Sequence, residues 1–143
     1  MGKPPNAVII VGCGKAKIWS RGGHVGRVKA QDAYVGSLFK SARRFAETRG
    51  ANWLILSAKY GLLRPDQVIS DYDVTFGSRG AISSKRLGRQ WRRLRNRPAI
   101  AVCIASRRYV SLLRASIPEG VFIRAPLDGM DLFERMRWLK SHA

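Results

Sequence analysis

Acidic side chains are scarce in this chain, and three of them lie close together. The chain has 27 Lys and Arg but only 9 Asp and Glu, and Asp66, Asp71 and Asp73 fall within eight residues of one another. A reaction that needs a general base, or a carboxylate to stabilise a developing cation, has few other candidates. Asp32 and Asp128 are two more, since both are expected near strand ends. The alternative is that Asp66 caps a turn and that Asp71 or Asp73 pairs with a surface arginine.

A glycine-bracketed turn with two lysines follows the first apolar run. Its sequence is Gly-Cys-Gly-Lys-Ala-Lys over residues 12–17, and such a turn presents backbone N–H groups and ammonium charge to a phosphate or an anionic base. It is neither a Walker A loop nor the dinucleotide fingerprint, and a tight structural turn is the alternative. Cys13 is a potential nucleophile but is expected to pack in the core, because no His is near it in sequence. His24 is expected to be a solvated loop residue rather than a group that stabilises a leaving base.

A second polar cluster, Ser-Ala-Lys-Tyr, follows the second apolar run. Polar side chains at the end of a buried strand are costly unless they face a site. We therefore expect Ser57, Lys59 and Tyr60 to belong to the same site as the first turn. Lys59 or Lys15 would stabilise an anion there, and Tyr60 or Tyr34 would stack on a planar ring.

The net charge of +18 favours a polyanionic partner, because such an excess otherwise destabilises the compact chain by self-repulsion. DNA is the expected partner, ahead of RNA, while a merely soluble basic surface and an anionic membrane are the alternatives. Basic side chains at a helix start after the third apolar run form a phosphate-binding arrangement. The residues expected to bind phosphates are Arg86, Arg89, Arg92, Arg93, Arg107 and Arg108.

Composition also excludes several classes of protein. The longest apolar run, residues 99–105, is far shorter than the ~20 residues of a membrane span, and we find no secretory signal. Two cysteines and two histidines, widely separated in sequence, do not make a zinc site. We therefore expect a cytoplasmic monomer without metal or cofactor.

The elements that must position these side chains follow from four continuous apolar runs. Continuous rather than alternating runs are typical of strands covered on both faces. The runs are residues 7–11, 53–56, 99–105 and 121–123. Helices are expected between and after them, at 30–49 with Gly50 as its cap, from Ser83 or Ser84, from Ser106 to near Pro118, and at 132–140; loops are expected at 19–28 and 64–79. This alternation predicts one α/β domain over residues 1–143, a three-layer α/β/α sandwich with a four-stranded, mostly parallel sheet.

Several of these motifs together resemble a known group of proteins. They are Cys-Gly-Lys-Ala-Lys at 13–17, Ala-x-Asp-x-Tyr at 30–34, Leu-Ile-Leu-Ser-Ala-Lys-Tyr-Gly-Leu-Leu at 54–63, Asp-Tyr-Asp at 71–73 and Pro-Leu-Asp-Gly-Met at 126–130. The chain resembles, from about residue 8 to 139, a small bacterial and phage family related to YaaA. That family is similar to the uracil-DNA-glycosylase-like fold and to a domain of archaeosine synthase.

The resemblance implies a sheet order of 2-1-3-4, a base-binding site over the strand ends, and DNA base excision or DNA binding. Gly36 stands where the family usually has Ser. The chain also lacks the Gly-Gln-Asp-Pro-Tyr and His-Pro-Ser motifs of uracil-DNA glycosylases. We therefore expect a modified base rather than plain uracil as the substrate.

The leading hypothesis is a DNA glycosylase that flips out a modified pyrimidine and hydrolyses its N-glycosidic bond, with defence against phages that carry modified DNA as its role. Asp73 is the first catalytic candidate, followed by Asp71 and Asp32, with Lys15 or Lys59 stabilising the departing base. The expected substrate-binding residues are Cys13, Gly14, Lys17, Tyr34, Ser57, Tyr60 and Asp128. The alternatives are a non-catalytic DNA-binding protein of the YaaA kind and a tRNA- or nucleotide-modifying enzyme.

Overall fold

A computed structural model describes residues 6–21, 26–49, 52–95 and 97–142 of the chain. The expectations for His24 and Gly50 fall outside these residues. Within them, no helix is long and apolar enough to cross a membrane.

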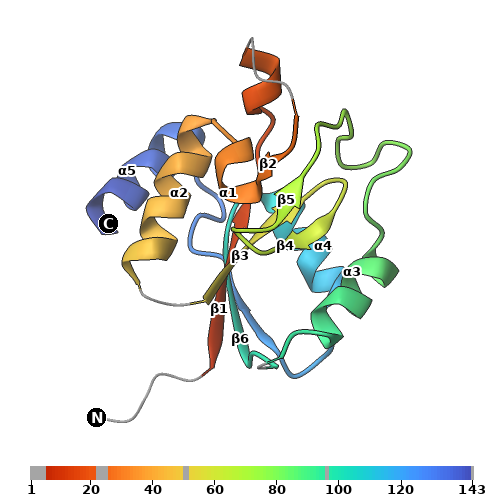
Figure 1. Ribbon diagram of the computed structural model, residues 1–143. Coiled ribbons are helices and arrows are strands. Elements are labelled where there is room, and N and C mark those ends of the chain that lie inside the picture. Colours follow the sequence, from red (N-terminus) through yellow and green to blue (C-terminus); the bar gives the residue numbers. More distant parts are fainter. Residues whose placement is uncertain (1–5, 22–25, 50–51, 96, 143) are drawn as a thin grey trace.

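The central sheet has five strands in the order β4-β3-β1-β6-β7 (Figure 1). Four of them, which correspond to the four apolar runs, are parallel to one another: β1 (Ala7–Gly12), β3 (Asn52–Ser57), β6 (Ile100–Ile104) and β7 (Phe122–Arg124). The expected count of four strands is wrong, because β4 (Gly61–Leu63) folds back antiparallel on β3. Gly61 allows this reversal with a φ of +74°, a conformation that costs glycine little.

Helices cover both faces of the sheet (Figure 1). The helices α2 (Ser37–Thr48) and α5 (Leu132–His142) lie on one face, where Phe39, Phe45 and Leu139 pack with Ile9 and Val11 of β1. The helices α3 (Ser84–Arg92) and α4 (Arg107–Ser116) lie on the other face and contribute an apolar layer of their own. The protein is therefore a mixed α/β sandwich around a mostly parallel sheet.

The helix expected over 30–49 is in fact two helices. The short helix α1 (Ala30–Ala33) ends at Tyr34, which adopts an extended conformation, and α2 begins at Ser37. Tyr34 forms an isolated antiparallel bridge with Lys17, and the Val35 N–H donates to the Ala16 carbonyl over 3.0 Å. The apolar spacing continues through this break, but pairing with the loop after β1 removes these residues from the helix.

The two expected loops also contain short regular elements. A 3₁₀ helix, η1 (Ile18–Arg21), follows β1, and a small antiparallel ribbon joins β2 (Val28–Lys29) to β5 (Val68–Ile69). The helix starts are closer to expectation. The Ser83 side chain accepts a hydrogen bond from the Arg86 N–H, as a helix cap does, whereas Ser106 precedes α4 without a side-chain cap bond.

Candidate functional site

Polar and aromatic side chains from four distant segments meet at one edge of the sheet. Parallel strands end together, so the residues after β1 and β3 are neighbours there. We call this place the carboxyl edge and define it by residues 12–17, 57–60, 70–73 and 105–109. Three contacts join the four segments. Lys17 lies over the Tyr72 ring, the Tyr72 hydroxyl is hydrogen-bonded to Ser57, and the Tyr109 hydroxyl accepts a hydrogen bond from the loop after β1.

A chain of buried hydroxyl groups lies beneath the carboxyl edge. The Tyr72 hydroxyl is hydrogen-bonded to that of Tyr34 at 2.7 Å and to Ser57 Oγ at 3.0 Å. Ser57 is fully buried and also accepts from the backbone N–H groups of Lys59 and Tyr60. Burial raises the pKa of both Tyr34 and Tyr72 well above the ordinary value, with the nearby Cys13 as the next cause. Both phenols therefore stay neutral, and the hydrogen bonds to Tyr34 and Ser57 hold the Tyr72 side chain in one place.

Tyr109, in the first turn of α4, holds the loop after β1. Its hydroxyl accepts a hydrogen bond from the Gly14 N–H over 3.0 Å and lies 3.5 Å from Cys13 Sγ. Gly14 has a φ of +73°, which favours glycine. The Phe76 ring meets the Tyr109 ring edge-on, and burial raises the pKa of Tyr109, so this phenol is also neutral. The loop thus keeps a fixed shape beside α4.

Two ammonium groups lie over the Tyr72 ring. Lys17 Nζ is 4.6 Å from the ring centroid and Lys59 Nζ is 6.0 Å from it; Lys59 Nζ is also 5.2 Å from the centroid of Tyr60. Such cation–π contacts orient the ammonium groups without neutralising them. Lys15, on the same loop as Lys17, is exposed. The carboxyl edge therefore presents fixed positive charge next to aromatic surface.

Asp71 and Asp73 flank Tyr72 and are both exposed, while the tyrosine between them is buried. Within the described part of the chain, neither carboxylate forms an ion pair or a hydrogen bond. Of the other seven acids, four pair with arginine, and two cap the start of α5, where Asp131 Oδ1 accepts from the Glu134 N–H and Glu134 Oε1 from the Asp131 N–H. The seventh, Glu119, is exposed in the turn between α4 and β7, away from the carboxyl edge, and makes no ion pair among the described residues. The acids paired with arginine are Asp32, Glu47, Asp66 and Asp128.

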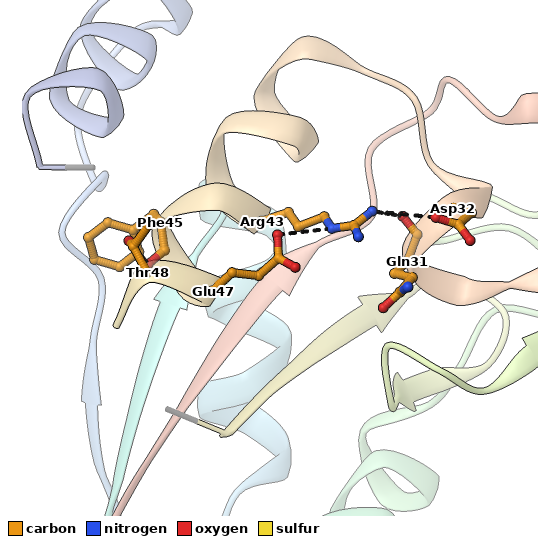
Figure 2. A network of polar contacts seen from close by, with 6 residues as sticks. All are labelled: Gln31, Asp32, Arg43, Phe45, Glu47 and Thr48. Atoms are coloured by element: carbon orange, nitrogen blue, oxygen red, sulfur yellow. Dashed lines mark hydrogen bonds and ion pairs between the residues drawn. The ribbon is translucent and has the colours of Figure 1, made fainter. Parts of the chain in front are cut away.

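Asp32 is one of the paired acids, unlike Asp71 and Asp73 in the described part of the chain. Figure 2 shows the Arg43 guanidinium between Asp32 and Glu47, with its Nη1 3.6 Å from Asp32 Oδ1 and its Nε 3.1 Å from Glu47 Oε1. Arg43 Nη1 also donates to the Gln31 carbonyl over 2.8 Å. The Asp32 carboxylate thus joins α1 to α2.

Asp128 is held in the same manner, because Arg107 Nε lies 3.7 Å from its Oδ1. This ion pair links the start of α4 to the turn after β7. Both groups are largely exposed, so the pair contributes little to stability. It nevertheless gives Asp128 a cationic partner, which Asp71 and Asp73 lack among the described residues.

Three of the expected substrate-binding residues are buried, namely Cys13, Tyr34 and Ser57, the last at 0% exposure. Tyr34 is 2% exposed and packs on Phe39 with ring centroids 5.4 Å apart, so it offers no open face to a base. Cys13 is 3% exposed, in accord with the core alternative. Tyr60 remains half-buried, and its hydroxyl donates to the Ser70 carbonyl. Of the two tyrosines expected to stack on a base, only Tyr60 has accessible ring surface.

The expected phosphate-binding arginines are all exposed, but they do not form one group. Arg107 and Arg108 lie at the carboxyl edge. The helix α3 begins beside the end of β3, where the Ile82 N–H donates to the Ala58 carbonyl. The helix ends near the opposite end of that strand, and Arg93 lines a surface groove there together with Asn52. The arginines of α3 therefore extend away from the carboxyl edge.

Two residues of the site were not expected from their sequence context alone. Tyr72 and Tyr109 are separated from their partners by up to 96 positions, so no local pattern brings them together. The signals available were the acids on both sides of Tyr72 and the arginine pair before Tyr109. Among the described residues, no three His, Cys, Asp or Glu side chains converge to bind a metal ion.

The fold and the carboxyl edge define an α/β protein with a lysine- and tyrosine-lined site beside two unpaired carboxylates. Residues 8–141 match a family described as a family of unknown function (DUF6884), and the chain belongs to that family. It is also 38% identical over 123 residues to the uncharacterized protein YfjM of Bacillus subtilis (strain 168), a match that covers 83% of this chain and 82% of that protein. Neither description names an activity, so the function has to be argued from the site.

Proposed function

We propose that the protein is a DNA glycosylase that excises a modified pyrimidine by hydrolysis of the N-glycosidic bond. The observation that supports it best is the pair of unpaired carboxylates at the carboxyl edge. Asp71 and Asp73 make no ion pair in the described part of the chain, although the protein has 27 Lys and Arg. A carboxylate beside a bound polyanion weakens binding of that polyanion. It accelerates a reaction only if positive charge develops next to it in the transition state.

Hydrolysis of an N-glycosidic bond develops charge of that kind. The C1′–N bond breaks with its electron pair leaving on the base, and the sugar becomes an oxocarbenium-like cation. A carboxylate close to C1′ stabilises this cation and orients the water that adds there, and the proton released by the water goes to the departing base. We assign this role to Asp73 first and to Asp71 second. Lys17 and Lys59, over the Tyr72 ring, would stabilise the base anion.

Flipping the nucleotide supplies access to this bond, which is out of reach inside the stacked duplex. Unstacking costs a few kcal/mol, which contacts to phosphates and to the flipped ring must offset. Arg107, Arg108 and Lys15 are exposed at the carboxyl edge and suit the phosphates on both sides of the nucleotide. The half-buried ring of Tyr60, with Lys59 beside it, suits stacking on the base.

The resemblance to the YaaA-related family and to the uracil-DNA-glycosylase-like fold supports the same reading. The missing uracil-glycosylase motifs favour a modified pyrimidine over uracil. A cytoplasmic role in defence against phages is part of the proposal, because phage DNA that carries modified pyrimidines would be a substrate for this activity.

The test compares matched Asp-to-Asn substitutions, which remove a charge and preserve side-chain size. Duplex and single-stranded oligonucleotides that each carry one modified pyrimidine are incubated with the wild type, Asp73→Asn, Asp71→Asn and Asp66→Asn. Abasic sites are scored by alkaline cleavage, and DNA affinity is measured separately. Asp66 is the control because it is an exposed aspartate of the same chain segment that lies 3.5 Å from Arg64 and lines the groove at the opposite end of β3.

We expect Asp73→Asn to lower the excision rate by about 10²-fold or more, on the scale of losing one electrostatic group, with DNA affinity equal or higher. Asp66→Asn should retain the wild-type rate. Loss in Asp71→Asn alone would move the catalytic role to Asp71. DNA binding without abasic sites from any substrate would contradict the proposal and favour the non-catalytic alternative, and preferential action on tRNA would favour the RNA-modifying one.

A further inference from the structure

Residues of α2 and α5 line a surface hollow. These two helices lie on the opposite face of the sheet from α3 (Figure 1). Its volume is about 590 Å³. We call it the α2/α5 hollow and define it by its lining residues, which are Ser41, Arg44, Phe133, Met136, Arg137, Leu139 and Lys140. The lining thus combines apolar side chains with three cations and no acid.

Large apolar side chains are exposed at this hollow. Phe133 is 69% exposed, and its neighbour Leu132, in the first turn of the same helix, is 61% exposed. The Arg137 guanidinium lies 5.1 Å from the centroid of the Phe133 ring. Scattered exposed apolar residues are normal, but adjacent ones beside a hollow are typical of a binding surface.

The cations of the α2/α5 hollow are not neutralised by neighbouring acids. Within the described ranges, Arg44, Arg137 and Lys140 form no ion pair. The nearest acids along the two helices are already engaged, because Glu47 pairs with Arg43 (Figure 2) and Glu134 caps α5 through the Asp131 N–H. The hollow therefore attracts a ligand that brings both negative charge and an apolar group.

We propose that the α2/α5 hollow docks an acidic, amphipathic segment of a partner protein. An apolar side chain of that segment would fill the space lined by Phe133, Met136 and Leu139, while its carboxylates would face Arg44 and Arg137. A second copy of this chain does not fit, since two chains of charge +18 repel one another. Duplex nucleic acid does not fit either, because its outer surface is the charged sugar–phosphate backbone and its bases are stacked inside.

This docking is independent of the proposed glycosylase activity. The helices α3 and α4 lie on the other face of the sheet (Figure 1), so a partner on α2 and α5 leaves Arg107 and Arg108, at the start of α4, accessible to DNA.

The experiment selects peptides from a random displayed library on the full-length protein, with counter-selection on Phe133→Ser. Enriched peptides are synthesised, and their affinities are measured for the wild type, Phe133→Ser and the double variant Arg44→Glu/Arg137→Glu. Phe122→Ser is the matched apolar control, because Phe122 is 62% exposed on β7. Lys85→Glu/Arg114→Glu, exposed residues of α3 and α4, is the matched charge control. Thermal unfolding verifies that every variant is folded.

We expect the enriched peptides to be acidic and to contain a large apolar residue. Both hollow variants should weaken binding at least tenfold, about 1.4 kcal/mol, while both control variants should bind as the wild type does. Failure to enrich peptides, or equal loss in the control variants, would overturn the proposal. A loss of affinity for duplex DNA or for phosphatidylserine vesicles that is confined to the hollow variants would also overturn it and would assign the hollow to that ligand.

Discussion

Removing the Tyr72 hydroxyl tests whether the buried hydroxyl chain holds the carboxyl edge together. Tyr72→Phe keeps the ring, and with it the contact with Lys17, but deletes hydrogen bonds of 2.7 Å to Tyr34 and 3.0 Å to Ser57. Ser57 Oγ retains the backbone N–H donors of residues 59 and 60. The Tyr34 hydroxyl, in a residue that is 2% exposed, loses its 2.7 Å partner and keeps only the Ser57 hydroxyl near it. Tyr34 is therefore the buried group that Tyr72→Phe leaves poorly satisfied.

The magnitude follows from those contacts. A lost hydrogen bond costs about 0.5–1.5 kcal/mol, and an unsatisfied buried group raises the cost to about 1–3 kcal/mol. We expect Tyr72→Phe to lower the free energy of unfolding by about 2–3 kcal/mol. For a chain of this size, that lowers the melting temperature by about 6–9 °C.

The assay is urea and thermal unfolding of Tyr72→Phe beside Tyr60→Phe. Tyr60 is the matched control, because its hydroxyl donates to the Ser70 carbonyl at the surface and water replaces that partner, so the cost should stay below about 1 kcal/mol. Tyr34→Phe combined with Tyr72→Phe should cost less than the sum of the single variants, since neither hydroxyl is then left alone. Equal costs for Tyr72→Phe and Tyr60→Phe, together with additivity in the double variant, would refute the hydroxyl chain.

Two further predictions concern pH and salt. Burial raises the pKa of Tyr34, Tyr72 and Tyr109 above 10.0, so the unfolded chain loses these protons at a lower pH than the folded protein does. The stability present below pH 10 therefore falls as the pH rises, by up to about 1.4 kcal/mol per pH unit for each tyrosine. Urea unfolding at neutral and alkaline pH measures this loss, and equal stability at both would contradict it. DNA affinity should fall with salt, and Arg107→Ala/Arg108→Ala should lower the log–log slope by about 1.8, at about 0.9 for each phosphate contact. Arg93→Ala, at the far end of α3, should leave that slope unchanged, and a comparable decrease would place DNA along the whole helix.

The strands of the sheet could be predicted from sequence because buried parallel strands are apolar throughout. The strand β4 could not, since it has only three residues and depends on a distant side chain. Gln90 of α3 accepts a hydrogen bond from the Leu62 N–H and donates to the Tyr60 carbonyl, which holds this edge strand against β3. The break between α1 and α2 at Tyr34 could not be predicted for the same reason, because it depends on a bridge to Lys17, which is distant in sequence.

The location of the candidate site could be predicted from the sequence, but which of its acids form ion pairs could not. Its location after β1 and β3 followed from the rule that ligands bind at the carboxyl ends of parallel strands. Which acids are already paired did not follow from sequence. Asp128 meets Arg107 from a different turn, and Asp32 meets Arg43 across two helices. Only the folded arrangement separates these acids from Asp71 and Asp73.

The position of Tyr72 explains how two exposed carboxylates can be held in place without cationic partners. Tyr72 is buried while Asp71 and Asp73 on either side of it are exposed, so the two carboxylates point away from the core. The hydrogen bonds of the Tyr72 hydroxyl to Tyr34 and Ser57 fix this tyrosine in the core. The backbone of its chain neighbours Asp71 and Asp73 is thereby held in place. An ion pair would fix a carboxylate equally well but would neutralise it, as happens to Asp32. Anchoring through a neutral tyrosine fixes the segment and leaves both charges available, and a site that stabilises a cationic transition state needs both properties.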